Sequence, residues 1–258
     1  MKVISISNIK GGVAKTTTAA NLSAGLNKRG YKVLMIDSDP QTNLTMCFME
    51  EPEDGTPSLY TVYKGTSKIE KTIVNIKPGL DILPGDFELC SADLDFFREV
   101  GALKMLKKVL KKLKTNYDFV IVDTPPNLGF LSLNAFMVSD AILTPMETGS
   151  FSLKATRLLK KVLVQIEEER ESKLPVLGVL ITKFRYGTTV SKILEGSIEK
   201  AAALLGTTPF EYKIRQATAV EQSQLVKQDL FEYAPNAEVT KDYDFFVDEF
   251  LDRLKEVE

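Results

Sequence analysis

Short, continuous runs of apolar residues alternate along the chain with longer segments in which apolar positions recur every three or four residues. Apolar runs of this length and β-branched content predict strands that are covered on both faces. Their alternation with helical segments predicts an α/β fold, in which a mainly parallel, twisted sheet carries helices on both faces. We expect strands at residues 3–8, 31–37, 80–85, 117–123, 141–146, 176–182 and 210–214.

Helical spacing predicts helices between these strands and in the tail from residue 236. The tail holds eight acidic and three basic residues between Glu238 and Glu258, a net charge of −5. Anionic lipid would repel a helix of this charge, so we expect the tail to pack on the domain through its apolar side. The other helices are expected at residues 19–26, at 57–63, in a segment that ends near 171, and at 191–205.

Residues 103–113 combine leucines at helical spacing with lysines between them. Such a basic face can contact DNA phosphates, or it can simply keep a helix solvated. We favour the solvated face for this segment. The leucines are Leu103, Leu106, Leu110 and Leu113, and the lysines are Lys104, Lys107, Lys108, Lys111 and Lys112.

A glycine-containing loop lies between the first predicted strand and the first predicted helix. Backbone N–H groups in such a turn can surround phosphate oxygens, and the helix N-terminus adds positive charge at the same place. Lys15 is then placed to reach the β- and γ-phosphates, and the Thr16 hydroxyl to bind magnesium. A glycine turn with incidental lysines is disfavoured by the strand before it and the helix after it. The other predicted nucleotide contacts of the loop are Gly11, Gly12, Val13, Ala14 and Thr17.

This loop departs from the standard phosphate-loop pattern, G-x-x-x-x-G-K-[ST]. The first glycine of that pattern falls on Ile9 and the last falls on Ala14. An alanine held at positive φ is strained by about 1 kcal/mol. We therefore expect either a negative φ at Ala14 or a tolerated strain.

Three aspartates follow two of the predicted strands. Asp37 and Asp39 lie at the end of the strand at 31–37, and Asp123 ends the strand at 117–123. Open α/β sheets bind ligands at the carboxyl ends of their strands, and a phosphate-loop ATPase requires an aspartate there to hold a magnesium-bound water. A simple Asp-Pro turn is the alternative for residues 39–40. We favour a magnesium site that includes Thr16 and Asp123, and a ligand-binding position for Asp37 and Asp39.

The composition of the chain excludes several kinds of catalytic group, metal site and cellular location. A chain of 258 residues with 44% hydrophobic content accommodates one large α/β domain. Histidine is absent, which excludes the usual general base, and two cysteines are too few for a disulfide framework or a closed zinc site. The first apolar run is too short for a signal peptide, and no run reaches the length of a membrane span, so we expect a cytoplasmic protein. A net charge of −2 means that any nucleic-acid binding has to come from a local patch.

The motif K-G-G-x-x-K-T-T at residues 10–17 resembles the deviant phosphate loop of the ParA and MinD family of ATPases. The D-x-D-P-Q motif at 37–41 resembles the first switch of that family, and the D-x-P-P motif at 123–126, with 127–130, resembles its second switch. The resemblance implies that Lys10 crosses a dimer interface to the nucleotide of the partner subunit. It also implies that Asp39 orients the attacking water and that Asp37 lies in the outer shell of the magnesium.

Residues 215–218 occupy the place of a proline-arginine-asparagine segment that lines the adenine in this family, and only Arg215 matches it. Arg215 and Gln216 are therefore the nucleotide contacts that the resemblance implies outside the loop.

The closest resemblance is to ParA and Soj partition ATPases of the short kind, so we expect residues 1–258 to form a single ATPase domain without an amino-terminal DNA-reading domain. The family implies ATP and Mg²⁺ as cofactors, ATP-dependent homodimers, nonspecific binding of double-stranded DNA, and slow hydrolysis that a ParB-like centromere-binding partner stimulates. It also implies association with the nucleoid in plasmid or chromosome partition. Candidate DNA contacts are Lys183, Arg185, Lys192, Lys213, Arg215 and Lys227.

Other classes of protein fit the sequence less well. The nitrogenase iron protein shares the deviant loop but needs a cluster ligand after the Asp123 strand, and no cysteine follows Asp123. A MinD-like ATPase that positions cell division on the membrane is disfavoured by the acidic tail. A polysaccharide-type tyrosine kinase requires a tyrosine cluster that Tyr233 and Tyr243 do not make. A binding module with an inactive site is disfavoured because the lysines, threonine and aspartates are all present.

Overall fold

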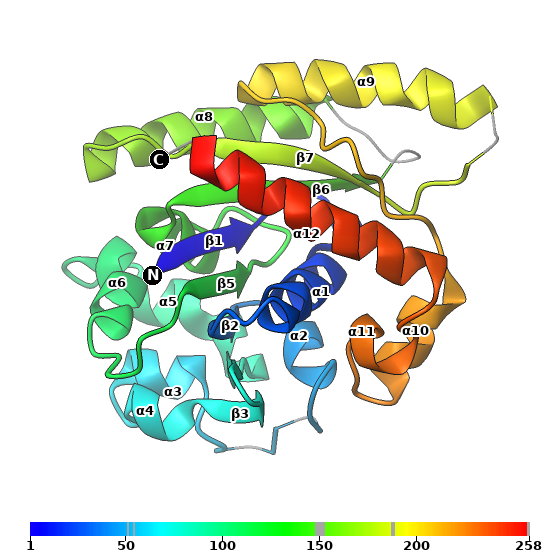
Figure 1. Ribbon diagram of the computed structural model, residues 1–258. Helices are drawn as coiled ribbons and strands as arrows, with labels where there is room; N and C mark the ends of the chain where they lie inside the picture. Colours follow the sequence, from blue (N-terminus) through cyan, green and yellow to red (C-terminus); the bar gives the residue numbers. More distant parts are fainter. Residues whose placement is uncertain (51, 54, 148–152, 187–188, 257–258) are drawn as a thin grey trace.

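A single seven-stranded sheet organises the protein in a computed structural model that describes residues 1–50, 52–53, 55–147, 153–186 and 189–256 (Figure 1). The strand order is β3-β4-β2-β5-β1-β6-β7, and every neighbouring pair is parallel except β3 and β4. The sheet is therefore mainly parallel, as the sequence predicts. Its strands are β1 (Lys2–Ile6), β2 (Val33–Asp37), β3 (Val74–Lys77), β4 (Leu80–Leu83), β5 (Phe119–Asp123), β6 (Ala141–Glu147) and β7 (Val176–Thr182).

Helices cover both faces of the sheet, and the sheet separates two apolar cores. Successive residues of a strand alternate between the two cores, so Val3 packs in one and Ile4 in the other. One core is covered by α3 (Leu59–Lys64), α4 (Ile69–Thr72), α5 (Ala92–Phe96), α6 (Met105–Leu110), α7 (Phe130–Val138), α8 (Leu153–Arg170) and α9 (Thr189–Leu205). The other is covered by α1 (Lys15–Lys28), α2 (Asn43–Met46), α10 (Thr218–Leu225), α11 (Leu230–Tyr233) and α12 (Glu238–Glu256).

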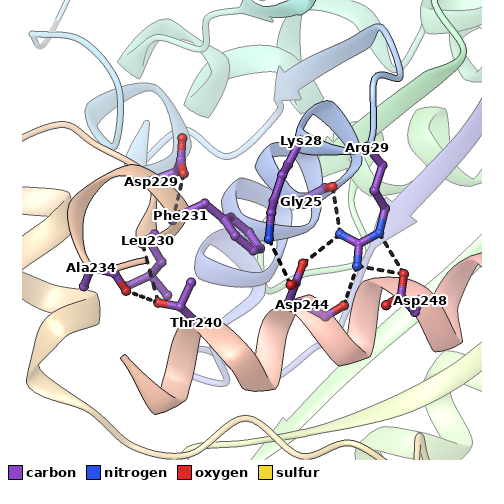
Figure 2. A network of polar contacts seen from close by, with 10 residues as sticks. All are labelled: Gly25, Lys28, Arg29, Asp229, Leu230, Phe231, Ala234, Thr240, Asp244 and Asp248. Atoms are coloured by element: carbon purple, nitrogen blue, oxygen red, sulfur yellow. Dashed lines mark hydrogen bonds and ion pairs between the residues drawn. The ribbon is translucent and has the colours of Figure 1, made fainter. Parts of the chain in front are cut away.

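Helix α12 packs across α1, which confirms that the acidic tail folds onto the domain (Figure 1). Polar contacts fix the two helices to each other at their solvent edge, as Figure 2 shows. The Arg29 guanidinium donates to the Asp244 backbone carbonyl at 2.8 Å and to the Asp248 carboxylate at 2.8 Å, while Lys28 pairs with Asp244 at 2.9 Å. None of the described helices combines the length and the apolar content that crossing a membrane requires.

Two expected elements differ from the structure. Residues 210–214 were expected as a strand, but the isolated bridges lie on either side of this segment, at Pro209 with Val179 and at Arg215 with Phe184. The reason is a side chain from α12: the Glu249 carboxylate accepts the backbone N–H groups of Glu211 at 2.9 Å and Tyr212 at 3.2 Å, so these amides do not join the sheet. The helix expected over 103–113 is shorter, because α6 proper covers Met105–Leu110 and a 3₁₀ turn at Ala102–Lys104 precedes it.

Candidate functional site

The loop between β1 and α1 has the backbone of a phosphate cradle. Gly12 has φ 77° and Ala14 has φ 62°, so both take the left-handed conformation. The strain expected for an alanine at positive φ is therefore tolerated at Ala14. A Cβ atom added to Gly11 or Gly12 would meet no heavy atom within 4 Å, which shows that the space beside the loop is open. The first turn of α1 has no side-chain cap, so its N–H groups are available to an anion.

Side chains from neighbouring strands hold this loop in place. The Asn8 amide donates to the Pro145 carbonyl of β6 at 2.8 Å, and the Lys10 backbone N–H donates to the Asn8 side chain at 3.0 Å. From β7, the Thr182 hydroxyl donates to the Val13 carbonyl at 3.1 Å. The loop is thus tied to β6, which neighbours β1, and to β7, which neighbours β6, and this keeps its amides oriented without a ligand.

Lys15 is the buried cation of the site. Its side chain begins α1 and is 7% exposed. Burial lowers the pKa of its ammonium group, and the negative charges of Asp123 and Asp39 act in the opposite direction. A partly desolvated ammonium close to open space has a strong electrostatic preference for an added anion.

Two fully buried aspartates lie side by side at the carboxyl edge of the sheet. Asp37 of β2 and Asp123 of β5 are register partners. Asp37 accepts the Thr45 backbone N–H and hydroxyl, both at 2.7 Å, and burial raises its pKa to about 6. Asp123 accepts the Thr16 hydroxyl at 2.6 Å, and burial together with the charge of Asp37 raises its pKa well above the ordinary value.

The second carboxylate oxygen of Asp123 is buried and has no hydrogen-bond partner among the described residues. A buried carboxylate without a partner is unfavourable unless a proton or a cation satisfies it. Hydroxyl and carboxylate oxygens are the ligands that Mg²⁺ prefers, so Thr16, Asp123 and nearby Asp37 fit a magnesium ion bound together with phosphates. The residues predicted for the metal therefore converge in space.

A cavity of about 890 Å³ lies beside Lys15 and Thr16, and Asp37 and Asp123 are not among its lining residues. It combines the loop, Asp39 of the expected first switch, and the segment expected at the adenine. Asp39 is 6% exposed and accepts the Gln41 backbone N–H at 3.0 Å. The side chain of Val13 is buried and does not line the cavity, and Lys10 is not among the lining residues of the single chain. The predicted residues that do line it are Gly11, Gly12, Ala14, Lys15, Thr16, Thr17, Asp39, Arg215 and Gln216.

Arg215 and Gln216 reach the cavity while bound to other side chains. The Arg215 guanidinium forms two hydrogen bonds with the Asp242 carboxylate, at 2.6 and 2.8 Å. The Gln216 side-chain carbonyl accepts from Arg185 at 2.9 Å. Asp242 therefore holds Arg215 against α12, so the arginine lines the cavity as part of an ion pair.

Sequence reasoning missed the contribution of α10 to the cavity wall. Val220, Glu221 and Gln224 of this helix line the cavity, and the Gln224 amide lies 3.3 Å from the Thr17 hydroxyl. The helix is short and has only one buried residue, Ser223. Its sequence thus carries no apolar repeat from which the wall could have been found.

Known proteins are similar to this chain in both sequence and fold. Residues 1–176 match the family model described as an AAA domain. The sporulation initiation inhibitor protein Soj of Bacillus subtilis is 33% identical over 182 residues, which cover 70% of this chain and 72% of Soj. The chromosome partitioning protein ParA of Caulobacter vibrioides is 30% identical over 195 residues, which cover 74% of this chain and 73% of that protein.

Two solved structures show nucleotides on the same fold. Cobyrinic acid a,c-diamide synthase from Mycobacterium smegmatis with bound ATP analog and magnesium superposes with a TM-score of 0.84 at 26% identity, covering 100% of this chain and 97% of that one. An aspartate-to-alanine variant of McdA from Cyanothece in complex with ATP gives a TM-score of 0.84 at 25% identity, covering 98% of this chain and 96% of that one.

Proposed function

This chain belongs to the ParA and Soj family of partition ATPases, and from that premise we propose that it is an ATP- and Mg²⁺-dependent DNA-segregation ATPase. In this proposal the ATP-bound form pairs with a second copy and binds double-stranded DNA without sequence preference. A ParB-like partner stimulates its slow hydrolysis, and the protein works in the cytoplasm on the nucleoid. The observation that supports the ATPase most directly is the buried Asp123 carboxylate, which Thr16 contacts through one oxygen while the other has no described partner.

Each residue of the candidate site has a role in this proposal. The loop amides and Lys15 hold the phosphates, and Thr16, Asp37 and Asp123 hold the magnesium and its water shell. Magnesium, when bound, offsets the charge that develops on the phosphates. Asp39 orients the attacking water in this proposal. It is the one aspartate among the described residues that line the cavity.

Pairing of two chains is proposed through Lys10. This residue lies in the loop and is only partly buried, whereas Lys15 is buried. Two ATP molecules between facing subunits bring much negative charge together, and a lysine from each subunit would offset it. Hydrolysis removes the γ-phosphate and with it the charge that favours the pair. We treat residues 1–258 as one ATPase domain, since one continuous sheet carries all of these groups.

The C-terminal candidates for DNA contact are largely neutralised within the chain. Lys213 pairs with Glu195 at 2.9 Å, Arg215 pairs with Asp242, and Lys227 pairs with Glu50. The side chain of Lys192 lies outside the described residues. Lys183 and Arg185 remain as candidates, so the proposed DNA binding needs positive charge from elsewhere in the dimer.

The experiment that tests the function is sedimentation of the Asp39→Ala variant with ATP, Mg²⁺ and DNA. We expect the variant to retain ATP, to sediment as a dimer on DNA, and to release phosphate at least about 100-fold more slowly than the unmodified protein. Asp95→Ala is the matched control, because Asp95 is an aspartate outside the cavity. A variant that binds ATP but stays monomeric and ignores DNA would contradict the partition function, and failure of the unmodified protein to hydrolyse ATP would contradict the ATPase.

A further inference from the structure

We propose that the exposed lysines of residues 104–114 form a surface that binds the phosphates of double-stranded DNA. The inference rests on the proposed function for the identity of the polyanion, and it places the contact on a part of the chain that sequence reasoning assigned to a solvated face. We call this surface the lysine face. It consists of Lys104, Lys107, Lys108, Lys111, Lys112 and Lys114.

The apolar residues of the segment fix the direction of its lysines. Leu106, Val109 and Leu110 are 0%, 5% and 5% exposed and pack in the core, whereas all six lysines are exposed. No acidic residue interrupts residues 104–114. At helical rise α6 itself spans about 9 Å, roughly the length of three base pairs of DNA, so several lysines on and beside it can reach phosphates of one strand at once.

The lysine face is also free of compensating charge within the described part of the chain. Its one ion pair joins Lys104 to Glu169 at 3.9 Å, and the other five lysines form no ion pair with a described residue. The cations near the C-terminal half differ, because Lys213, Arg215 and Lys227 all pair with carboxylates. A lysine that has no carboxylate partner gives up less on binding a phosphate, so this surface has the larger capacity for DNA.

Exposed apolar side chains occur just before the lysine face, and such side chains can insert into a membrane. Membrane binding is therefore the alternative to DNA binding for this surface. They lie in residues 86–100, where five acidic residues and one basic residue occur between Asp86 and Glu99. An anionic bilayer repels a segment of that charge. Within residues 101–114 no large apolar side chain is exposed, so the lysines have no neighbour that could insert into lipid. The observations therefore favour DNA. The exposed apolar residues are Phe87, Leu94, Phe97 and Val100.

The position of the lysine face suits a protein that pairs through its phosphate loop. Residues 111–118 lead into the amino end of β5, whereas the phosphate loop follows the carboxyl end of its parallel neighbour β1. Figure 1 shows α6 on the side of the molecule away from α10 and α11, and α10 lines the nucleotide cavity. DNA on the lysine face would leave the phosphate loop open to a second copy.

A buried asparagine links the lysine face to the expected second switch. Asn134 of α7 accepts the Leu106 backbone N–H at 3.1 Å and donates to the Ala102 carbonyl at 3.0 Å. Helix α7 begins at Phe130, the last residue of the segment that resembles the second switch. A movement of that switch on ATP binding would therefore reach the lysines through α7, which gives ATP a route to control DNA binding.

The test measures binding of the full chain to double-stranded DNA with ATP and Mg²⁺ over a range of salt concentrations. The test variant carries Lys107→Gln, Lys108→Gln, Lys111→Gln and Lys112→Gln. The matched control carries Lys32→Gln, Lys64→Gln, Lys68→Gln and Lys71→Gln, which removes the same charge from four exposed lysines outside the segment. We expect the test variant to bind at least about 10-fold more weakly, with a salt slope reduced by about 1 for each lysine that contacts a phosphate, and the control to bind like the unmodified protein.

Three results would overturn the inference. Equal affinity and equal salt slope for the test variant would remove the lysine face as the contact while leaving the proposed function intact. If the unmodified protein binds anionic phosphatidylserine vesicles and the test variant does not, while both bind DNA equally, the lysine face binds a membrane and not DNA. Absence of DNA binding by the unmodified protein would remove the DNA part of the proposed function together with this inference. Unchanged ATP hydrolysis by the test variant verifies that it has folded.

Discussion

The Thr16 hydroxyl donates a hydrogen bond of 2.6 Å to the Asp123 carboxylate, although the two residues are 107 positions apart in the chain. The bond joins the first turn of α1 to the end of β5 at the place where the sequence predicts magnesium. Because the other oxygen of Asp123 is buried without a described partner, Thr16 provides the one hydrogen bond to this carboxylate that the structure describes.

Removal of the Thr16 hydroxyl should separate nucleotide binding from hydrolysis. We expect Thr16→Ala to bind ATP through the loop and Lys15, but to hydrolyse it at least about 100-fold more slowly, because the proposed magnesium ligand and a partner of Asp123 are lost together. Thr16→Ser keeps the hydroxyl and serves as the control. Phosphate release over a magnesium titration measures both variants, and hydrolysis at the unmodified rate by Thr16→Ala would contradict the assigned role.

The buried carboxylates predict a pH dependence of stability in the protein without metal. Burial raises the pKa of Asp37 from 3.8 to about 6, so between these values the folded state binds more protons than the unfolded state. The contribution of Asp37 is therefore fully present below pH 4 and is lost as the pH rises through 6, by roughly 3 kcal/mol. The pKa of Asp123 is also raised, which extends the loss to higher pH.

Urea unfolding of the unmodified protein and Asp37→Asn at pH 5 and pH 8, with metal chelated, measures this effect. We expect the asparagine variant to gain stability relative to the unmodified protein as the pH rises, because it has no carboxylate to ionise. Magnesium and ATP should reduce the difference by satisfying the ionised carboxylates. If the unmodified protein and Asp37→Asn differ in unfolding free energy by the same amount at both pH values, burial does not raise the pKa of Asp37.

A cap supplied by Asp93 should stabilise α7, the helix that begins at the end of the segment resembling the second switch. Helix α7 has Gly129 at its N-cap and no local side-chain cap, but the Asp93 carboxylate accepts the Phe130 backbone N–H at 2.6 Å. We expect Asp93→Ala to lower the free energy of unfolding by about 1 kcal/mol and Asp93→Asn to keep most of it, since the amide oxygen can still accept. Urea unfolding measures both.

Gly129 permits that cap to approach. A Cβ atom at this position would lie 2.7 Å from an Asp93 carboxylate oxygen. Gly129→Ala should therefore destabilise the protein by displacing the Asp93 carboxylate, and combining it with Asp93→Ala should add little further loss. Fully additive losses would show that the two residues act independently.

Arg29 should contribute more to the attachment of α12 than its neighbour Lys28. Its side chain is 19% exposed and contacts the Gly25 carbonyl as well as two residues of α12, whereas Lys28 is 52% exposed and forms one ion pair (Figure 2). We expect Arg29→Ala to lower the free energy of unfolding by about 2 kcal/mol and Lys28→Ala by less than about 0.5 kcal/mol. Equal losses in thermal or urea unfolding would contradict this ranking.

Local patterns were sufficient to predict the loop and the parallel strands of the sheet, but not the antiparallel edge strand β3. The strand at 176–182 coincides with β7, and the run at 141–146 lies within β6, because both are buried on two faces and are continuously apolar. The loop was predicted because its glycines, Lys15 and Thr16 are adjacent in the sequence. Such features depend on neighbouring residues and therefore leave a signal in the sequence.

The remaining features depend on contacts between distant segments. The expected strand at 210–214 fails because Glu249 binds two of its amides, and Arg215 is held by Asp242 of α12. Likewise, the sequence cannot show that Lys213 has a carboxylate partner while Lys107, Lys108, Lys111 and Lys112 form no ion pair with a described residue. Pairing of surface charge is a property of the folded chain, and for that reason the choice between a solvated and a DNA-binding face required the structure.

The place of β1 in the sheet affects when the protein can fold during synthesis. This strand is made well before its two neighbours, β5 and β6, which pair with it through residues that are more than a hundred positions later, as in Lys2 with Phe119 and Ile4 with Ala141. A ribosome must therefore release most of the chain before the phosphate loop gains its supporting strands, and such long-range pairing is slow. Until then β1 has no strand to pair with, and its apolar side chains are exposed to other molecules.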